Sequence, residues 1–210
     1  MGIAVLIMGQ SGTGKSASMR NFKGNEIGVI NVAGKPLPFK SDIKTINSDS
    51  YKQAEYTLQN CKVDTIVIDD SQYLMADEFM KRSKESGFQK FTDIGYNFWH
   101  LVNLVRSLPE NKIVYFLQHT EISDSGREKA KTIGKLIDEK ITLEGLFSIV
   151  LKTQIVDGHY YFTTQSNGLD TVKSPIGMFR EQLIDNDLKM VDQTIRKYYG
   201  LNKEETDEKN

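Results

Sequence analysis

An apolar run near the start of the chain leads directly into a glycine-rich octet. Residues 3–8 read Ile-Ala-Val-Leu-Ile-Met, and the octet is Gly9, Gln10, Ser11, Gly12, Thr13, Gly14, Lys15 and Ser16. A short unbroken apolar run is typical of a strand buried on both faces of a parallel sheet. The octet fits the pattern G-x-x-x-x-G-K-[ST], which forms a loop between such a strand and a helix. We therefore expect a strand, a phosphate-binding loop and a helix over residues 14–22.

The defining residues of the octet have separate roles in binding a nucleotide. Glycines let the backbone curl until its N–H groups point at phosphate oxygens. A helix that begins near Gly14 adds the positive end of its dipole. We expect Lys15 to reach the β- and γ-phosphates and the Ser16 hydroxyl to coordinate Mg²⁺. The octet therefore predicts a site for ATP and Mg²⁺.

A second strand-like run, residues 65–68, ends in the carboxylates Asp69 and Asp70. A phosphate-binding loop of this kind needs a second acidic group to hold Mg²⁺. We expect Asp69 to bind Mg²⁺ through water and Asp70 to polarise the attacking water. The alternative is that the two acids only cap the next helix. Asp70 is also one methylene shorter than the Glu that many ATPases have at this position.

Strand-like and helix-like segments alternate over the first half of the chain. Strands are predicted at 27–32, 65–68 and 113–117, and helices at 51–59, 74–83 and 92–107. Such alternation predicts an α/β fold with a mainly parallel central sheet. We find no internal repeat and no clear linker, so we expect one domain over residues 1–200.

The second half of the chain has a different pattern. Residues 118–135 are polar and contain two glycines, which predicts a long loop. Strand-like runs at 147–156 and 160–164 flank Asp157-Gly158, a strong hairpin signal. A helix is predicted over 183–199, although Asp185-Asn186-Asp187 can break it. The acidic tail, residues 201–210, is expected to be disordered.

Charge and composition exclude several classes of protein. Lys and Arg number 27 against 28 Asp and Glu, so the chain is not a bulk polyelectrolyte binder. Any DNA contact must come from a local basic segment or from an oligomer. The single cysteine excludes an internal disulfide framework. No apolar run approaches the roughly 18 residues of a membrane span. We expect a soluble cytoplasmic protein that does not interact with a membrane.

Polar residues directly follow the strand predicted at 113–117. Gln118 is placed to reach the γ-phosphate, and His119 is the next candidate. The alternative is that both residues simply leave the sheet. No His and Cys spacing suggests a zinc site.

Beyond the octet, several longer motifs resemble a known family. They are residues 30–39 (INVAGKPLPF), 67–74 (VIDDSQYL), 131–135 (KTIGK), 173–179 (KSPIGMF) and 184–188 (IDNDL). The chain resembles, over nearly its whole length, the small RecA-like or AAA-type P-loop ATP-binding proteins of phage recombination and replication modules. The resemblance implies a RecA-like P-loop NTPase core with a C-terminal β-hairpin and helix. It also implies a role near single-stranded DNA, often beside a single-strand annealing or replication protein.

The resemblance also suggests residues for DNA contact. RecA-like ATPases commonly bind DNA through two loops, one after the strand that ends in the Mg²⁺-binding acid and one after the strand that ends in the γ-phosphate sensor. The candidate DNA-binding residues are Arg127, Lys129, Lys131 and Lys135, which lie near a single acid, Glu128. A role for Lys131 or Lys135 at a subunit interface or at the γ-phosphate stays open, as does a plain surface loop. Residues 77–93 combine bases with Phe side chains, but four acids cancel their charge, so a solvated helix and turn is the alternative.

Hydrolysis in this superfamily often needs a cation from a neighbouring subunit. We expect a homo-oligomer in which Lys173, or less favourably Arg180, supplies that cation; the alternative is a surface charge near a turn. RecA-type ATPases place a Glu near the end of the strand after the loop helix, but the segment here is Asn31-Val32-Ala33-Gly34. That difference leaves Asp70 as the candidate base, or implies slow hydrolysis.

These observations lead to one principal function and two alternatives. The principal hypothesis is an oligomeric, Mg²⁺-dependent ATPase that acts on or beside single-stranded DNA in phage recombination or replication. A non-hydrolysing nucleotide switch that recruits a partner protein is the first alternative, because the expected Glu is missing. A small-molecule or nucleotide kinase is the second, weakened because only Arg127 stands in the loop after Gln118. A GTPase is disfavoured because Asn111-Lys112-Ile113-Val114 lacks the Asp that reads guanine.

Overall fold

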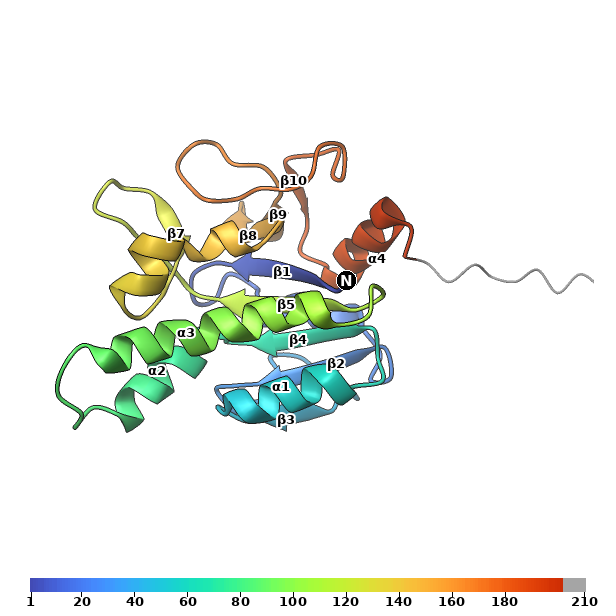
Figure 1. Cartoon of the computed structure of the whole chain (residues 1–210). Helices are drawn as coiled ribbons and strands as arrows, with labels where there is room; N and C mark the ends of the chain where they lie inside the picture. Colours follow the sequence, from blue (N-terminus) through green and yellow to red (C-terminus); the bar gives the residue numbers. More distant parts are fainter. Residues whose placement is uncertain (202–210) are drawn as a thin grey trace, which may run out of the picture.

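The computed structural model describes residues 1–201 and is built around one large sheet (Figure 1). The strand order is β10-β9-β8-β1-β5-β4-β2-β3. The ladders that join β8, β1, β5, β4, β2 and β3 are all parallel, whereas β8–β9 and β9–β10 are antiparallel. The chain thus has the mixed α/β fold with a mostly parallel central sheet that the sequence predicts.

The strands of this sheet are short, and those in the middle of the sheet are mostly buried. Their bounds are β1 (Ile3–Met8), β2 (Ile27–Asn31), β3 (Thr45–Asn47), β4 (Thr65–Asp69), β5 (Ile113–Gln118), β8 (Ile149–Val156), β9 (His159–Thr163) and β10 (Leu183–Asp185). The helices are α1 (Tyr51–Asn60), α2 (Gln72–Lys81), α3 (Gln89–Leu104) and α4 (Leu188–Tyr199). Shorter helical segments are η1 (Ser16–Asn21), η2 (Val105–Ser107), η3 (Leu136–Ile141) and η4 (Leu143–Leu146).

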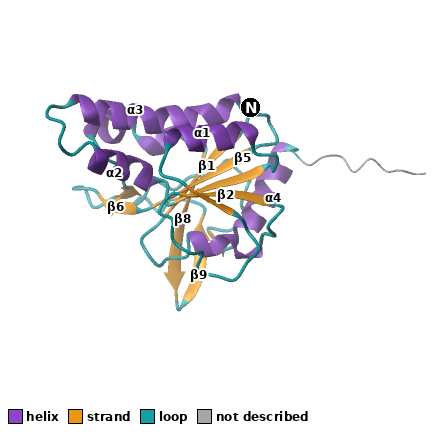
Figure 2. Cartoon of the chain, turned by 90° about the horizontal axis from the view of Figure 1, so that it is seen from below, coloured by secondary structure: helices purple, strands orange, loops and turns teal. Residues whose placement is uncertain are grey.

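Two apolar layers form because successive strand residues point to opposite faces of the sheet. Leu6 and Ile68 face α1, α2 and α3, which contribute side chains such as Leu58 and Phe98. Val5 and Val67 face the other layer, where η1 and α4 pack. Figure 2 shows α1, α2 and α3 together on one side of the sheet and α4 apart from them. Both faces of the parallel strands are therefore covered, which explains their unbroken apolar sequences.

The connections place a crevice at the carboxyl ends of the central strands. The strand that follows β1 in the sequence, β2, lies on one side of β1 in the sheet, the side of β5. The strand that continues the sheet after β5, β8, lies on the other side of β1. Ligands of open parallel sheets bind outside the carboxyl ends of the strands where the direction of winding switches. The glycine-rich octet follows β1, Asp69 ends β4 and Asp70 follows it, so all of them lie at this edge.

The helix predicted over residues 14–22 is shorter and tighter than expected. The structure has a 3-10 helix, η1, over Ser16–Asn21 only. Gly14 has φ +97°, a left-handed conformation that no right-handed helix contains, and Phe22 is extended. The prediction that a helix begins near Gly14 was therefore wrong. The short helix that begins at Ser16 also has a smaller dipole than the predicted helix would have.

Two further predictions need correction. The loop predicted over 118–135 contains the end of β5 and a small antiparallel sheet of β6 (Thr120–Ile122) and β7 (Glu128–Ala130). Each of these strands has only three residues, two of them polar, which is too short for a recognisable alternating pattern. The helix predicted over 183–199 begins only at Leu188, because Leu183–Asp185 pair with β9 and the Asp187 side chain caps α4.

Other local predictions are confirmed. Asp157 and Gly158 have φ of +51° and +79°, as a two-residue hairpin turn between β8 and β9 requires. Gly200 ends α4 in the left-handed conformation. The predicted disordered tail falls, apart from Leu201, outside the described residues, so it stays a prediction. Within residues 1–201, none of the helices combines the length and apolar character that crossing a membrane requires.

Candidate functional site

The octet forms a tight loop that only glycine allows at several positions. Gly12 and Gly14 have positive φ angles of 81° and 97°. A Cβ atom on Gly9 would lie 2.0 Å from the Thr153 hydroxyl oxygen on β8. That hydroxyl is 2.6 Å from the hydroxyl of Thr13, so β8 supports the loop from the side. The contact of Thr153 with the loop was not predicted from the sequence.

Lys15 is folded back into its own loop. Its ammonium donates to the carbonyl oxygens of Gly9 at 2.7 Å and Gln10 at 2.9 Å, and Nδ1 of His119 is 3.5 Å away. The residue is only 5% exposed, and burial lowers the pKa of its amine to about 8 although Asp70 and Asp69 oppose the shift. A buried cation that is held by carbonyl groups at the loop is ready to bind an anion there.

Ser16 and Asp69 lie together in the cleft that Lys15 also lines. The Ser16 hydroxyl donates to Oδ1 of Asp69 at 2.9 Å, and Asp69 is 5% exposed. Burial raises the pKa of Asp69 from 3.8 to about 6, against the opposing effects of Ser16 and Lys15. A buried carboxylate beside a hydroxyl offers the hard oxygen ligands that Mg²⁺ prefers, and Mg²⁺ usually takes few ligands from the protein. These two residues fit the Mg²⁺ site predicted from the sequence.

The described residues hold no cluster of three or more His, Cys, Asp or Glu side chains that could bind a metal by themselves. A pair of protein ligands is what a site shared with substrate phosphates would supply. The pair therefore fits Mg²⁺ that arrives with a nucleotide better than a resident metal ion.

Asp70 is held between two basic side chains. Its carboxylate is 3.3 Å from Nζ of Lys35 and 3.3 Å from Nε2 of His119. Burial raises the pKa of Asp70, but the His119 hydrogen bond and the charge of Lys35 outweigh this and lower it overall. Its φ of +57° is unusual for a residue other than glycine and is most common at functional positions. Asp70 is therefore ionised and faces the cleft.

Lys35 also lines the cleft, although no role was predicted for it from the sequence. The residue follows β2, which pairs with β4, so it is carried to the end of β4 where Asp70 lies. Its ammonium also lies 5.3 Å from the centre of the Tyr73 ring. The side chain of Asn31 donates to the Lys35 carbonyl at 2.6 Å and fixes this segment. The basic residue in the family-like motif 30–39 was the signal that could have found it.

The sequence favoured Gln118 over His119 as the residue at the cleft, but the structure places His119 there. Gln118 is fully buried and donates through Nε2 to the Lys131 carbonyl at 2.6 Å, while its Oε1 has no partner among the described residues. His119 instead lines the cleft between Lys15 and Asp70. The structure thus brings His119 into the cleft beside Lys15 and sets Gln118 behind it.

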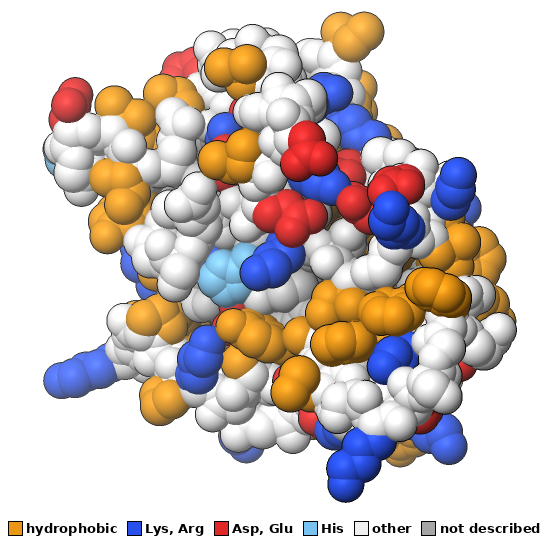
Figure 3. Space-filling view, turned by 90° about the vertical axis from the view of Figure 1, so that its left-hand side faces the viewer, with side chains coloured by type: hydrophobic (Ala, Val, Ile, Leu, Met, Phe, Trp, Pro, Cys, Tyr) orange, Lys and Arg blue, Asp and Glu red, His pale blue; other side chains and the backbone are white. Residues whose placement is uncertain are grey.

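The cleft has a volume of about 530 Å³, which is ample for the phosphates of a nucleotide. Figure 3 looks onto this edge of the sheet, where basic and acidic side chains lie side by side near the middle of the face. The lining residues are Ser11, Gly12, Gly14, Lys15, Ser16, Ala17, Asn31, Lys35, Pro36, Pro38, Asp69, Asp70, His119 and Tyr160. Five residues of the octet, both acids, the predicted candidate His119 and the unpredicted Lys35 therefore meet in one cleft.

Most of the predicted DNA-binding bases already have partners. Lys129 forms ion pairs with Asp138 and, at 3.5 Å, with Glu121. Lys135 is 3.6 Å from Glu139, and Arg127 donates to the Asp170 carbonyl at 3.0 Å. Lys131 is exposed. The sequence pointed to Glu128 as the single nearby acid, because all of these other acids lie outside residues 126–135.

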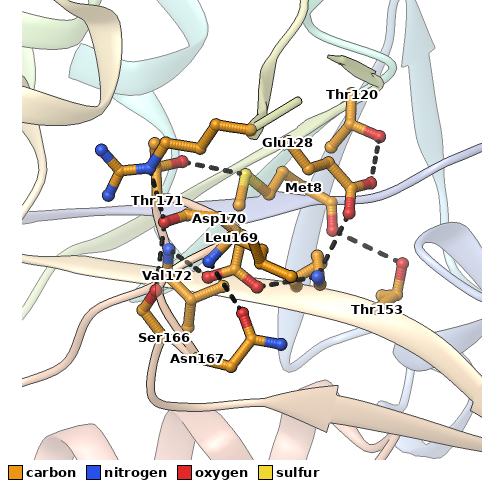
Figure 4. A network of polar contacts seen from close by, with 12 residues as sticks. Met8, Thr120, Glu128, Thr153, Ser166, Asn167, Leu169, Asp170, Thr171 and Val172 are labelled. Atoms are coloured by element: carbon orange, nitrogen blue, oxygen red, sulfur yellow. Dashed lines mark hydrogen bonds and ion pairs between the residues drawn. The ribbon is translucent and has the colours of Figure 1, made fainter. Parts of the chain in front are cut away.

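A buried polar network lies under this segment (Figure 4). Asp170, 1% exposed, accepts from the Lys152 ammonium at 2.7 Å, and Glu128 accepts from the same ammonium at 3.1 Å. Thr120 also donates to Glu128 at 2.7 Å. The small sheet β6–β7 is thereby tied to β8 and to residues 166–172, so Arg127 is part of a rigid support.

The other predicted basic residues lie away from the phosphate cleft. Lys173 is exposed, pairs through its backbone with Val150, and has a pKa lowered by burial against the opposing charge of Glu144. Arg180 is exposed and borders a different pocket. Neither lines the cleft of its own chain, and a role in a neighbouring subunit stays a prediction. Within 77–93, Arg82 pairs with Glu78, Glu85 and Asp93, as the solvated alternative expects.

Comparison with known proteins adds no relative. No family model matches the sequence, and no curated protein matches it. The family resemblance therefore rests on the motifs of this chain alone, and the functional argument rests on the geometry of the cleft.

Proposed function

We propose that this chain is a Mg²⁺-dependent ATPase with a RecA-like P-loop NTPase core. The proposed role is on or beside single-stranded DNA in phage recombination or replication. The observation that carries the proposal is the hydrogen bond between Ser16 and Asp69 in the cleft that also contains Lys15. Ser16 begins η1 and Asp69 ends β4, 53 positions further along the chain, and their meeting supports the phosphate-loop interpretation of the octet.

Phosphate binding would use groups that the loop already presents. Lys15 exchanges the carbonyls of Gly9 and Gln10 for phosphate oxygens, a charge-assisted contact that is stronger than a contact with a neutral acceptor. Ser16 and Asp69 hold Mg²⁺, which supplies positive charge to the phosphates when bound. Loop N–H groups complete the cradle because Gly12 and Gly14 adopt conformations closed to other residues.

Hydrolysis requires that Asp70 or a neighbour orient a water molecule. Asp70 is ionised, as a base must be, but Lys35 and His119 both hold its carboxylate. Binding of a γ-phosphate gives Lys35 a second anionic partner and frees one oxygen of Asp70. His119, hydrogen-bonded through one nitrogen to Asp70 and near Lys15 through the other, keeps that carboxylate at the cleft.

The engaged state of Asp70 also supports the second candidate function. A carboxylate that already interacts with Lys35 and His119 is a weaker base, and residues 31–34 contain no acid to replace it. A nucleotide-dependent switch that binds ATP, hydrolyses it slowly and recruits a partner protein would have this site. Turnover rather than binding separates the two functions.

The DNA and oligomer parts of the proposal have narrower support. Lys131 is exposed, and its carbonyl accepts from Gln118, the residue before His119. We propose that Lys131 contacts single-stranded DNA and that Arg127 supports the segment. Lys173 remains the proposed cation for a neighbouring subunit of a homo-oligomer.

ATP turnover with Mg²⁺, with and without single-stranded DNA and with the oligomer sized in parallel, tests this function. We expect turnover that DNA stimulates and that the variant Ser16→Ala loses, while Lys52→Ala on the exposed face of α1 serves as the matched control. ATP binding without turnover would favour the switch. Equal turnover in Ser16→Ala and the control would contradict the proposed site.

A further inference from the structure

A second pocket adjoins the phosphate cleft. It has a volume of about 590 Å³ and lies between η1, the tip of the β8–β9 hairpin and the turn from β10 to α4. Ala17 and Tyr160 line both the pocket and the phosphate cleft. The two hollows are therefore continuous past these two side chains, and one ligand can occupy both.

Tyr160 forms the wall between the two hollows. The Asp157-Gly158 turn places it at the hairpin tip, where it pairs with Ile155. Its side chain packs against the loop, because a Cβ atom on Gly14 would lie 2.9 Å from Cδ1 of the ring. The residue is nevertheless 48% exposed. An aromatic ring fixed beside a phosphate loop and open on its other side presents a surface for stacking a flat group.

Asn186 adds a polar group that has no partner. The residue is 1% exposed and lines the pocket, and its Nδ2 donates to nothing among the described residues. Its own position is fixed: its backbone N–H donates to the Tyr160 carbonyl at 3.2 Å, and Arg20 donates to its carbonyl at 2.5 Å. A buried amide donor without an acceptor is unfavourable, so a ligand acceptor that met it would be bound selectively.

Two carboxylates, Asp185 and Asp187, and one guanidinium, Arg20, line the pocket, and Arg20 already donates to the Asn186 backbone carbonyl. The lining therefore favours an uncharged polar group over phosphate. The exposed carboxylate of Asp185 borders the pocket, and Asp187 is occupied as the cap of α4 and by Asn21 at 2.8 Å. Carboxylates repel phosphates but accept hydrogen bonds from sugar hydroxyls. A flat base joined to a sugar has the chemistry that this lining matches.

We propose that this pocket binds the nucleoside part of the nucleotide whose phosphates lie at Lys15. The base stacks on Tyr160, an acceptor atom of the nucleoside meets Nδ2 of Asn186, and the sugar hydroxyls face Asp185. This assignment rests on the proposed function, because it needs the phosphates to lie in the octet loop.

Calorimetric titration with two probes tests the assignment: ATP, and inorganic tripolyphosphate, which has phosphates but no nucleoside, both with Mg²⁺. The wild-type protein should bind ATP at least tenfold more tightly than tripolyphosphate. Tyr160→Ala and Tyr160→Leu should weaken ATP binding at least tenfold and change tripolyphosphate binding less than twofold. Tyr160→Phe, which keeps the ring, and Tyr56→Ala on the exposed face of α1 should bind both probes as the wild type does.

The outcomes separate this assignment from the proposed function. If the wild-type protein binds neither probe, the nucleotide site itself is wrong and the pocket assignment falls with it. If it binds both probes equally tightly, or if the Tyr160 variants bind ATP as the wild type does, only the pocket assignment is wrong. An equal loss of both probes in Tyr160→Leu would show that Tyr160 only supports Gly14, and it would also overturn the assignment.

Discussion

Replacing Asp69 by Asn should stabilise the fold while it removes Mg²⁺ binding. The carboxylate is 5% exposed, and burial raises its pKa from 3.8 to about 6. The charged groups that face it are Asp70, which raises the pKa further, and Lys15, which lowers it. Because the pKa is higher in the folded protein, the ionised group costs stability at neutral pH. The difference corresponds to about 3 kcal/mol, an upper bound for the gain in Asp69→Asn.

The sign of the pH dependence follows from the same shift. An acid whose pKa is raised by folding adds stability below about pH 4 and loses it as the pH rises through about 6. Asn has no such titration. Asp69→Asn and the wild type should therefore be similar near pH 4, and the variant should be more stable above pH 6. The amide retains an oxygen that can accept from Ser16 as Oδ1 of Asp69 does.

Urea unfolding without Mg²⁺, at several pH values between 4 and 8, measures this difference, and taking it between the two proteins cancels the other titrating groups. Addition of Mg²⁺ and ATP should stabilise the wild type and leave the variant unchanged. Parallel stability curves for the two proteins, or a less stable variant at pH 7.5, would refute the claim that Asp69 is a costly buried charge kept for function.

Three further substitutions test separate parts of the site. Asp70→Asn should leave ATP binding within about twofold but slow turnover at least about tenfold, about 1.4 kcal/mol of transition-state stabilisation; unchanged turnover would remove Asp70 as the base. Lys35→Ala should weaken binding of ATP but not of ADP, because only ATP presents the γ-phosphate; equal effects on both nucleotides would place Lys35 elsewhere. Lys131→Ala should weaken single-stranded DNA binding and reduce its salt slope by about 0.7, whereas an unchanged slope would exclude a phosphate contact at this lysine.

Features of the site that depend on local sequence could be predicted. The octet and the strands around it follow from short patterns, and Lys15, Ser16 and Asp69 meet as expected because the carboxyl ends of parallel strands share one edge. The hairpin turn at Asp157-Gly158 is also a local signal. The sequence therefore predicted most of the sheet, but not β3 or β10, and the central part of the cleft.

Features that depend on distant contacts could not be predicted. Lys35 reaches Asp70 only because β2 lies beside β4. Ion pairs from Asp138 and Glu121 neutralise Lys129, although neither acid lies within the ten-residue segment that was compared. Asn186 lies within the helix that was predicted over 183–199. Its place beside Gly14 of the octet depends on the pairing of β10 with β9. In each case the tertiary arrangement decides which charge or amide is free.

Binding of ATP and Mg²⁺ to Lys15→Ala, compared with the wild type and with Lys52→Ala, tests the central claim most directly. Lys15 is the ammonium that the loop holds at the cleft, and its removal should leave the fold intact because its contacts are to carbonyls of its own loop. We expect at least about a tenfold loss of affinity, about 1.4 kcal/mol, in Lys15→Ala and none in the control. Wild-type affinity in a folded Lys15→Ala protein would contradict the assignment of residues 9–16 as a nucleotide-phosphate site.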